Sequence, residues 1–149
     1  MRRIARSAIV ECSARQMYDL VEDIEAYPEF LPWCSGAHVR ERTADRTVAT
    51  IDVGAPLPGM RQSFTTENTN VPGRSIDMRL LQGPFRRFEA HWKFAALGSG
   101  AARIEFTITY EFADRILARA LDPLFEGIAG TMVDAFTRRA GRIYGRHAS

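Results

Sequence analysis

Residues 27–34 read Tyr27-Pro28-Glu29-Phe30-Leu31-Pro32-Trp33-Cys34, a run in which two prolines stand among large apolar side chains. Proline fixes its own φ, lacks an N–H group and pushes the preceding residue toward an extended backbone. The run is therefore predicted to be a stiff, irregular connection, neither a helix interior nor a central strand. Loops usually carry polar side chains, whereas these aromatic side chains favour burial. The segment is expected either to plug the core or to form one wall of an apolar cavity.

The composition is that of one globular domain. At 149 residues, with 46% hydrophobic and 26% charged residues, the chain can bury a single core without metals or disulfides. Its formal net charge of +2 is too small to predict a nucleic-acid partner. Cys12 and Cys34 predict neither a zinc site nor a redox pair, and no stretch approaches the ~20 apolar residues of a membrane span. We expect one domain over residues 1–149 in the cytoplasm.

The segments before the run predict a strand and then a helix. Residues 3–11 alternate between apolar and polar side chains, which is typical of a strand. Ser13 is a good N-cap for a helix that carries Met17, Val21 and Ile24 on one face. Its acidic opposite face, within residues 19–25, is interpreted as a solvated surface rather than as a catalytic cluster.

From residue 37 the pattern changes to a period of two, which predicts an antiparallel sheet that is covered on one face. Residues 115–146 then predict one long helix, with Pro123 causing a kink or a restart at an Asp122 cap. Hairpin-connected strands curl, and a helix can close their concave side. The expected fold is α+β: a curved antiparallel sheet of six to seven strands wrapped around a long C-terminal helix, with short helices after the first strand.

The positions expected to face inward are unusually bulky. They either fill the interior completely, as aromatic side chains usually do, or line an apolar pocket that is open at one end. Composition alone favours the filled interior. The candidate pocket residues are Tyr27, Phe30, Leu31, Trp33, Phe64, Met78, Leu80, Phe85, Trp92, Phe94, Phe106, Tyr110, Phe125, Ile128, Met132 and Phe136.

Several motifs resemble those of the START-like and polyketide cyclase-like (SRPBCC) superfamily, which has a helix-grip fold. Within it, the chain is similar to the branch that contains the coenzyme Q-binding proteins and the RatA ribosome-association toxins. The resemblance covers nearly the whole chain and rests most on 27–34, Gly83-Pro84-Phe85, Trp92-Lys93-Phe94 and residues 132–136. It implies a lipid-sized cavity and a non-catalytic carrier of ubiquinone or a related polyprenyl lipid that supports respiration. No cofactor is required for that role.

The turn Gly83-Pro84-Phe85 joins two strands that face the expected cavity. It is interpreted as a gate with Phe85 as its apolar lip, although an ordinary tight turn needs the same glycine and proline. Leu57 and Met60, near a hairpin tip, are candidates for contact with a membrane surface, which would place the protein peripherally at the inner face of the membrane. Scattered exposed apolar residues are also normal in proteins that bind no membrane.

The resemblance leaves two other functions open. The toxin relatives imply binding to the large ribosomal subunit. The candidate phosphate contacts are Arg138, Arg139, Arg142 and Arg146. Arginines at a helix C-terminus also oppose the helix dipole, so they do not by themselves indicate a partner. The cyclase relatives imply an enzyme in which Tyr110 or Trp92 orients a substrate. The histidines His38, His91 and His147 have no ligand spacing, so no metal site is predicted.

Overall fold

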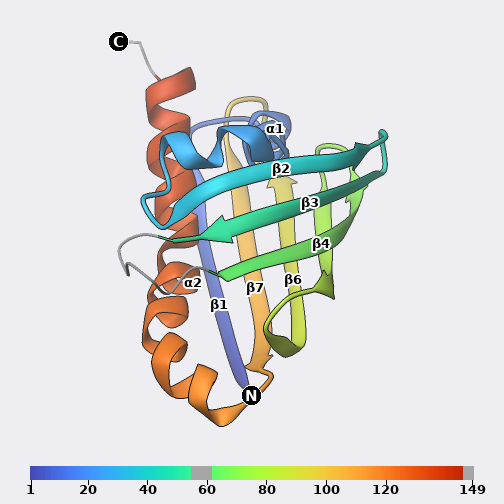
Figure 1. The fold of residues 1–149 in the computed structure, drawn as a ribbon. Helices are drawn as coiled ribbons and strands as arrows, with labels where there is room; N and C mark the ends of the chain where they lie inside the picture. Colours follow the sequence, from blue (N-terminus) through green and yellow to red (C-terminus); the bar gives the residue numbers. More distant parts are fainter. Residues whose placement is uncertain (55–61, 146–149) are drawn as a thin grey trace.

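The computed structural model describes residues 1–54 and 62–145. The elements, shown in Figure 1, are β1 (Arg2–Val10), α1 (Ala14–Glu22), the 3-10 helix η1 (Ile24–Glu29), β2 (Cys34–Arg42), β3 (Arg46–Val53), β4 (Gln62–Val71), β5 (Ser75–Gln82), β6 (Phe85–Ala96), β7 (Ala102–Phe112) and α2 (Arg115–Tyr144). The sequence predictions for Leu57, Met60, Arg146 and His147 lie outside the described residues.

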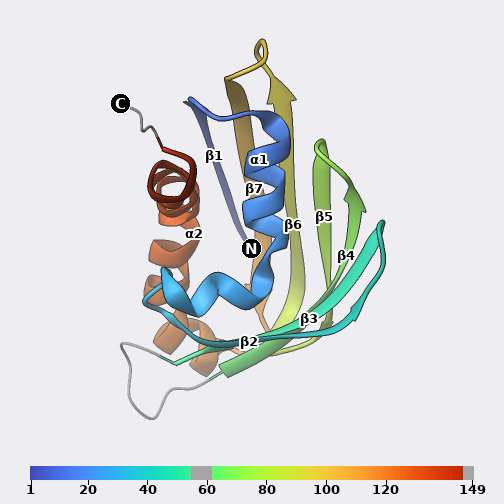
Figure 2. The same cartoon turned by 90° about the horizontal axis from the view of Figure 1, so that it is seen from above.

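The strands form one seven-stranded sheet in the order β1-β7-β6-β5-β4-β3-β2, with every neighbouring pair antiparallel. The sheet curls around an interior, α2 runs along its open side, and α1 with η1 covers one end (Figure 2). A twisted sheet of hairpins closes in this way because its apolar concave face must be covered. The structure confirms the predicted α+β helix-grip fold.

The first helix begins where the sequence predicts and ends earlier. The backbone N–H of Gln16 donates to Ser13 Oγ at 3.0 Å, and the Ser13 N–H donates to Gln16 Oε1 at 2.9 Å, which completes a capping box. Ile24 belongs to η1 rather than to α1. Pro28 also lies inside η1, so the prediction of a wholly irregular 27–34 run is wrong for its first residues. A short 3-10 turn accepts proline because the proline φ is already helical.

The long helix α2 is continuous through Pro123, so the predicted restart at Asp122 does not occur. Its N-cap is Asp114, whose carboxylate accepts the N–H of Leu117 at 2.8 Å. Asp122 instead forms an ion pair with Arg2, at 3.7 Å. Burial of Leu121 and Phe125 on either side of the proline holds the helix against the sheet, which compensates for the lost backbone hydrogen bond. Figure 1 shows the helix changing direction over its first turns.

Candidate functional site

One aromatic cluster fills the interior beside the Gly83-Pro84-Phe85 turn. Phe125 on α2 lies at its centre, with its ring centroid 4.7 Å from that of Tyr110 and 5.2 Å from that of Phe85. Phe85 also stacks on Phe112, with ring centroids 4.7 Å apart. Phe64 on β4 completes the cluster, 6.5 Å from Phe125. The helix and both halves of the sheet therefore meet through ring contacts at this end of the molecule.

A β-bulge brings two phenylalanines of β6 into this cluster. The register between β6 and β7 shifts between Phe85 and Arg87. An extra residue in a strand changes the face on which later side chains lie. Phe85 and Phe88 are consequently both buried, although three positions separate them, and Arg86 and Arg87 are both exposed. The bulge adds a ring to the interior that strict alternation would place in solvent.

An apolar cavity of about 20 Å³ lies within the cluster. It has room for about one water molecule, so the space enclosed by these rings is much smaller than the lipid-sized cavity that the family resemblance implies. Rings from β4, β6, β7 and α2 pack against one another around it. The residues that line the cavity are Val53, Gln62, Phe64, Pro84, Phe85, Phe112, Leu121, Leu124 and Phe125.

The predicted gate lies at the edge of this cavity. Gly83 has a φ of +158°, and a Cβ atom there would lie 2.7 Å from Cβ of Phe64, so only glycine fits so close to β4. Pro84 and Phe85 line the cavity. Phe85 is buried rather than exposed as a lip. Any opening of this turn therefore requires the Phe85 ring to leave its neighbours.

A second aromatic cluster surrounds Phe136, nearer the C-terminal end of α2. The Phe136 ring is 5.3 Å from Trp92, 5.5 Å from Tyr27 and 5.2 Å from Phe30, measured between centroids. The Tyr27 hydroxyl donates a hydrogen bond to the carbonyl of Val21, and burial raises its pKa. The 27–34 run is thus packed against α2 and β6, and in the described structure its first rings plug the core.

The predicted pocket residues divide into two groups by burial. Eleven are buried: Tyr27, Leu31, Phe64, Phe85, Trp92, Phe94, Phe106, Tyr110, Phe125, Ile128 and Phe136. The other five, Phe30, Trp33, Met78, Leu80 and Met132, are partly buried and pack against the same core. The structure therefore brings all sixteen to one core, in which most of the aromatic ones pack in two ring clusters, around Phe125 and around Phe136.

The candidate ribosome contacts differ in their exposure to solvent. Arg139 is only 14% exposed: its guanidinium lies 4.8 Å from the Phe30 ring centroid and 2.9 Å from Glu29 Oε1. Its place is in the packing of the 27–34 run, which corrects the prediction of a free phosphate contact. Arg138 and Arg142 are exposed. These two side chains remain as candidates among the described residues.

The acidic face of α1 is more than a solvated surface. The Arg42 guanidinium of β2 donates to Glu22 Oε2 at 2.9 Å and to Glu25 Oε2 at 2.9 Å. Its hydrogen bond lowers the pKa of Glu25. Glu22 also accepts a hydrogen bond from Thr47 Oγ1, on β3, at 2.9 Å. These contacts tie α1 to the edge of the sheet and leave no sign of catalysis.

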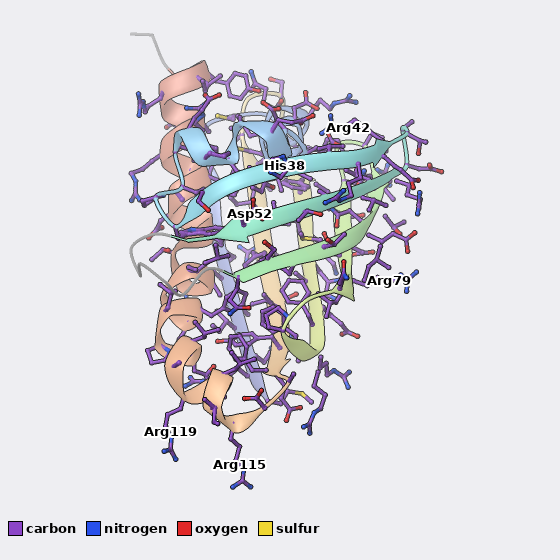
Figure 3. All side chains as sticks on the ribbon, viewed as in Figure 1. His38, Arg42, Asp52, Arg79, Arg115 and Arg119 are labelled. Atoms are coloured by element: carbon purple, nitrogen blue, oxygen red, sulfur yellow. The ribbon has the colours of Figure 1, made fainter. Side chains whose placement is uncertain are left out.

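His38 and His91 lie on the outer face of the sheet, each beside an aspartate. His38 Nε2 is 3.4 Å from Asp52 Oδ2 on the neighbouring strand (Figure 3), and His91 Nδ1 is 2.9 Å from Asp77 Oδ1. Within residues 1–54 and 62–145, no three histidine, cysteine, aspartate or glutamate side chains are grouped to hold a metal ion. None of the described helices is long and apolar enough to cross a membrane.

Sequence reasoning missed a buried polar row on the concave face. Beyond Phe64, the inward positions of β4 are Thr66, Asn68 and Asn70, and Thr47 lies beside them on β3. All four polar side chains are at most 3% exposed. The signal was present in the sequence, since continuing the period of two from Phe64 reaches each polar residue of β4 in turn.

Tyr110→Phe is expected to raise the free energy of unfolding by about 1–3 kcal/mol, because an unpaired buried hydroxyl is costly. Tyr110 is fully buried, and its hydroxyl has no hydrogen-bond partner among the described residues. Burial also raises its pKa to about 12. Urea unfolding of Tyr110→Phe and of the control Tyr27→Phe, which loses the bond to Val21, measures both effects. A destabilised Tyr110→Phe protein would show that the hydroxyl is hydrogen-bonded after all.

Known proteins share both the sequence pattern and the fold. The model of the family described as polyketide cyclase / dehydrase and lipid transport matches residues 10–137. The ribosome association toxin RatA of Pseudomonas aeruginosa is 44% identical over 142 residues, which cover 95% of this chain and 97% of the toxin. A mitochondrial coenzyme Q-binding protein, COQ10 homolog B of Xenopus laevis, is 30% identical over 95% of this chain and 59% of its own length.

Solved structures agree at the level of the fold. The Zhui aromatase/cyclase of Streptomyces sp. R1128 superposes with a TM-score of 0.82 and 16% identity, over 99% of this chain and 98% of the cyclase. So low an identity shows the shared fold and not a shared activity. The family match spans most of the chain, and the RatA relative aligns almost end to end. The chain therefore belongs to the polyketide cyclase / dehydrase and lipid transport family.

Proposed function

We propose that this protein binds a hydrophobic ligand of the quinone or polyprenyl lipid class between the sheet and α2. The observation that carries the proposal is the aromatic cluster around Phe125, with an apolar cavity already formed beside it. Each buried methylene contributes roughly 0.8 kcal/mol before ordering costs, so an isoprenoid tail needs no charged anchor. A relative named as coenzyme Q-binding, similar over 95% of this chain, supports that ligand class.

Ligand entry requires the rings around the cavity to move, because the cavity itself has room for about one water molecule. The cavity beside Pro84 and Phe85 is the natural starting point: side chains there already lack close neighbours on one side. The ligand would take over the ring contacts that it displaces. An opening of this kind is a shift in population between a closed and an open arrangement, and the ligand favours the open one.

We infer that binding is not accompanied by catalysis. A cyclase needs convergent acid and base groups whose pKa values suit neutral pH. Tyr110 lies beside the cavity cluster, but its pKa is raised to about 12 by burial, so it is a weak proton donor and is not ionised at neutral pH. Trp92 offers only an indole N–H and lies in the other cluster, against Phe136.

The test of the proposal is extraction of the natively purified protein with organic solvent, followed by mass spectrometry. A quinone or polyprenyl lipid is expected in near-equimolar amount, and the stripped protein is expected to take up added quinone from detergent. Failure of both steps would overturn the proposal. Recovery of a hydrophobic ligand from another chemical class would keep the binding function and correct the ligand.

Association with the ribosome is a second candidate, which uses a different part of the molecule. It is favoured by the 44% identity to a protein named as a ribosome association toxin. It also fits the exposed guanidinium groups of Arg138 and Arg142, four residues apart on α2. Cationic side chains that contact phosphate make binding dependent on salt. An interior ligand and a surface contact do not exclude each other.

The double variant Arg138→Glu/Arg142→Glu is expected to lose salt-sensitive co-sedimentation with large ribosomal subunits and to keep its extractable lipid. The control is Arg115→Glu/Arg119→Glu, with the same charge change at the other end of α2, where both side chains point away from the molecule (Figure 3). Equal loss in both variants would indicate non-specific attraction to RNA. Unchanged sedimentation of the first variant would rule out this surface.

A further inference from the structure

The concave face of the sheet changes from apolar to polar along β4. Phe64 lines the cavity, and the next inward side chains are Thr66, Asn68 and Asn70. Inward positions of a strand are two residues and therefore ~7 Å apart. The polar row thus begins about 7 Å from the cavity and continues toward the end of the sheet that α1 covers. One strand face carries both the cavity wall and the row.

Hydrogen bonds within the protein satisfy only part of the polar atoms in this row. Asn70 Nδ2 donates to Thr47 Oγ1 at 3.0 Å, and Thr47 Oγ1 donates to Glu22, so this half anchors α1. Thr66 Oγ1 donates to Asn68 Oδ1 at 2.8 Å, a bond within one strand that anchors nothing else. The Asn70 Oδ1 atom is buried without a partner among the described residues. Burying an acceptor without a partner lowers stability, so a role in stabilising the fold does not explain why these buried side chains are polar.

The neighbours of Thr66 and Asn68 are partly open apolar side chains. Thr66 pairs with Leu80 across the β4–β5 ladder, and Asn68 pairs with Met78. Both partners face the interior but are only partly buried. Methionine and leucine side chains can repack with little loss, methionine in particular because it is unbranched. The side chains beside this half of the row can therefore make room for a small polar group by repacking.

We propose that Thr66, Asn68 and Asn70 form the subsite for an uncharged, oxygen-bearing head of the ligand, whose apolar tail extends toward Phe64 and the cavity. This inference rests on the proposed function. Amide N–H groups of the row can donate to carbonyl, hydroxyl or ether oxygens, whereas the unpaired Asn70 Oδ1 only accepts and is satisfied by a hydroxyl on the head. Glu22, which bonds to Thr47 of this region, is held by Arg42, and Glu67, on the other face of β4, is paired with Arg46 and Arg79. The row therefore presents no free charge to the ligand. A charged head would lack the partner that its burial demands.

The test compares two ligands with the same tail, a decyl-substituted benzoquinone and decylbenzene, by quenching of tryptophan fluorescence. The variant is Thr66→Val/Asn68→Leu, which removes both members of a mutually bonded pair and is therefore expected to leave stability nearly unchanged. Its affinity for the quinone is expected to fall roughly 10-fold, as expected for about two lost hydrogen bonds, while its affinity for decylbenzene stays within about 2-fold. Thr69→Val, on the exposed face of the same strand, is the control and is expected to change neither affinity.

The outcomes separate the two proposals. If the wild-type protein binds neither compound, the proposed function fails and this subsite fails with it. If the wild-type protein binds both and the double variant loses both equally, or loses neither, the subsite is overturned while the binding function stands. If the double variant does not fold, Thr66→Val alone is expected to lower quinone affinity in the same direction by about 3-fold, and no change would count against the subsite.

Discussion

Phe136→Ala is expected to lower the free energy of unfolding by about 3–5 kcal/mol, near the upper limit for a single core truncation. Phe136 is fully buried and lies between Tyr27, Phe30 and Trp92. The loss is at the high end when neighbours cannot collapse into the space that is left. Tyr27 is held by its bond to Val21, and Phe30 lies under the Arg139 guanidinium. Neither ring is free to follow the missing side chain.

Equilibrium unfolding in urea measures this loss through the fluorescence of the two tryptophans, Trp33 and Trp92. Arg138→Ala is the matched control, since it lies two positions away on the exposed face of α2 and is expected to stay within about 0.5 kcal/mol of the wild type. A loss below about 1 kcal/mol for Phe136→Ala would contradict the tight packing of the second cluster.

Most elements of the fold could be predicted from patterns of residues that are close in the sequence. Within the stretch of period two, residues 103–112 alternate between polar and apolar side chains, and β7, Ala102–Phe112, lies there because alternation records which side chains face the core. The Ser13 cap was predictable for the same reason: the hydrogen bonds that define it span only three residues. Where a structure depends on neighbours in sequence, the residues themselves are sufficient to predict it.

Long-range packing explains what local pattern missed. The sequence left a kink or a restart open at Pro123, and only the burial of Leu121 and Phe125 in one continuous helix decides against the restart. Glu22 looked solvated because its partners, Arg42 and Thr47, lie on other elements. The size of the cavity depends on how the rings from four elements pack together. No single segment of the sequence determines that packing.

Phe125→Ala is expected to cost about 3–5 kcal/mol in the absence of ligand and, unlike Phe136→Ala, to regain stability when an apolar ligand is added. Phe125 borders the cavity of about 20 Å³, so its removal joins that cavity to the volume of the lost ring. Phe136 lies eleven residues further along α2, roughly 16 Å away, and its contacts are with the second cluster. Only the Phe125 site already has an apolar space to extend.

Adding decylbenzene at about 100 times its dissociation constant is expected to restore about 2.7 kcal/mol to Phe125→Ala and to restore little to Phe136→Ala. The comparison is internal, because both variants lose the same side chain from the same helix. If both variants regained the same free energy of unfolding, the ligand would bind wherever space is made. That result would contradict an entrance at the cavity beside Pro84 and Phe85. Recovery confined to Phe125→Ala locates the ligand tail at that cavity, since a ligand stabilises only the folded state whose space it fills.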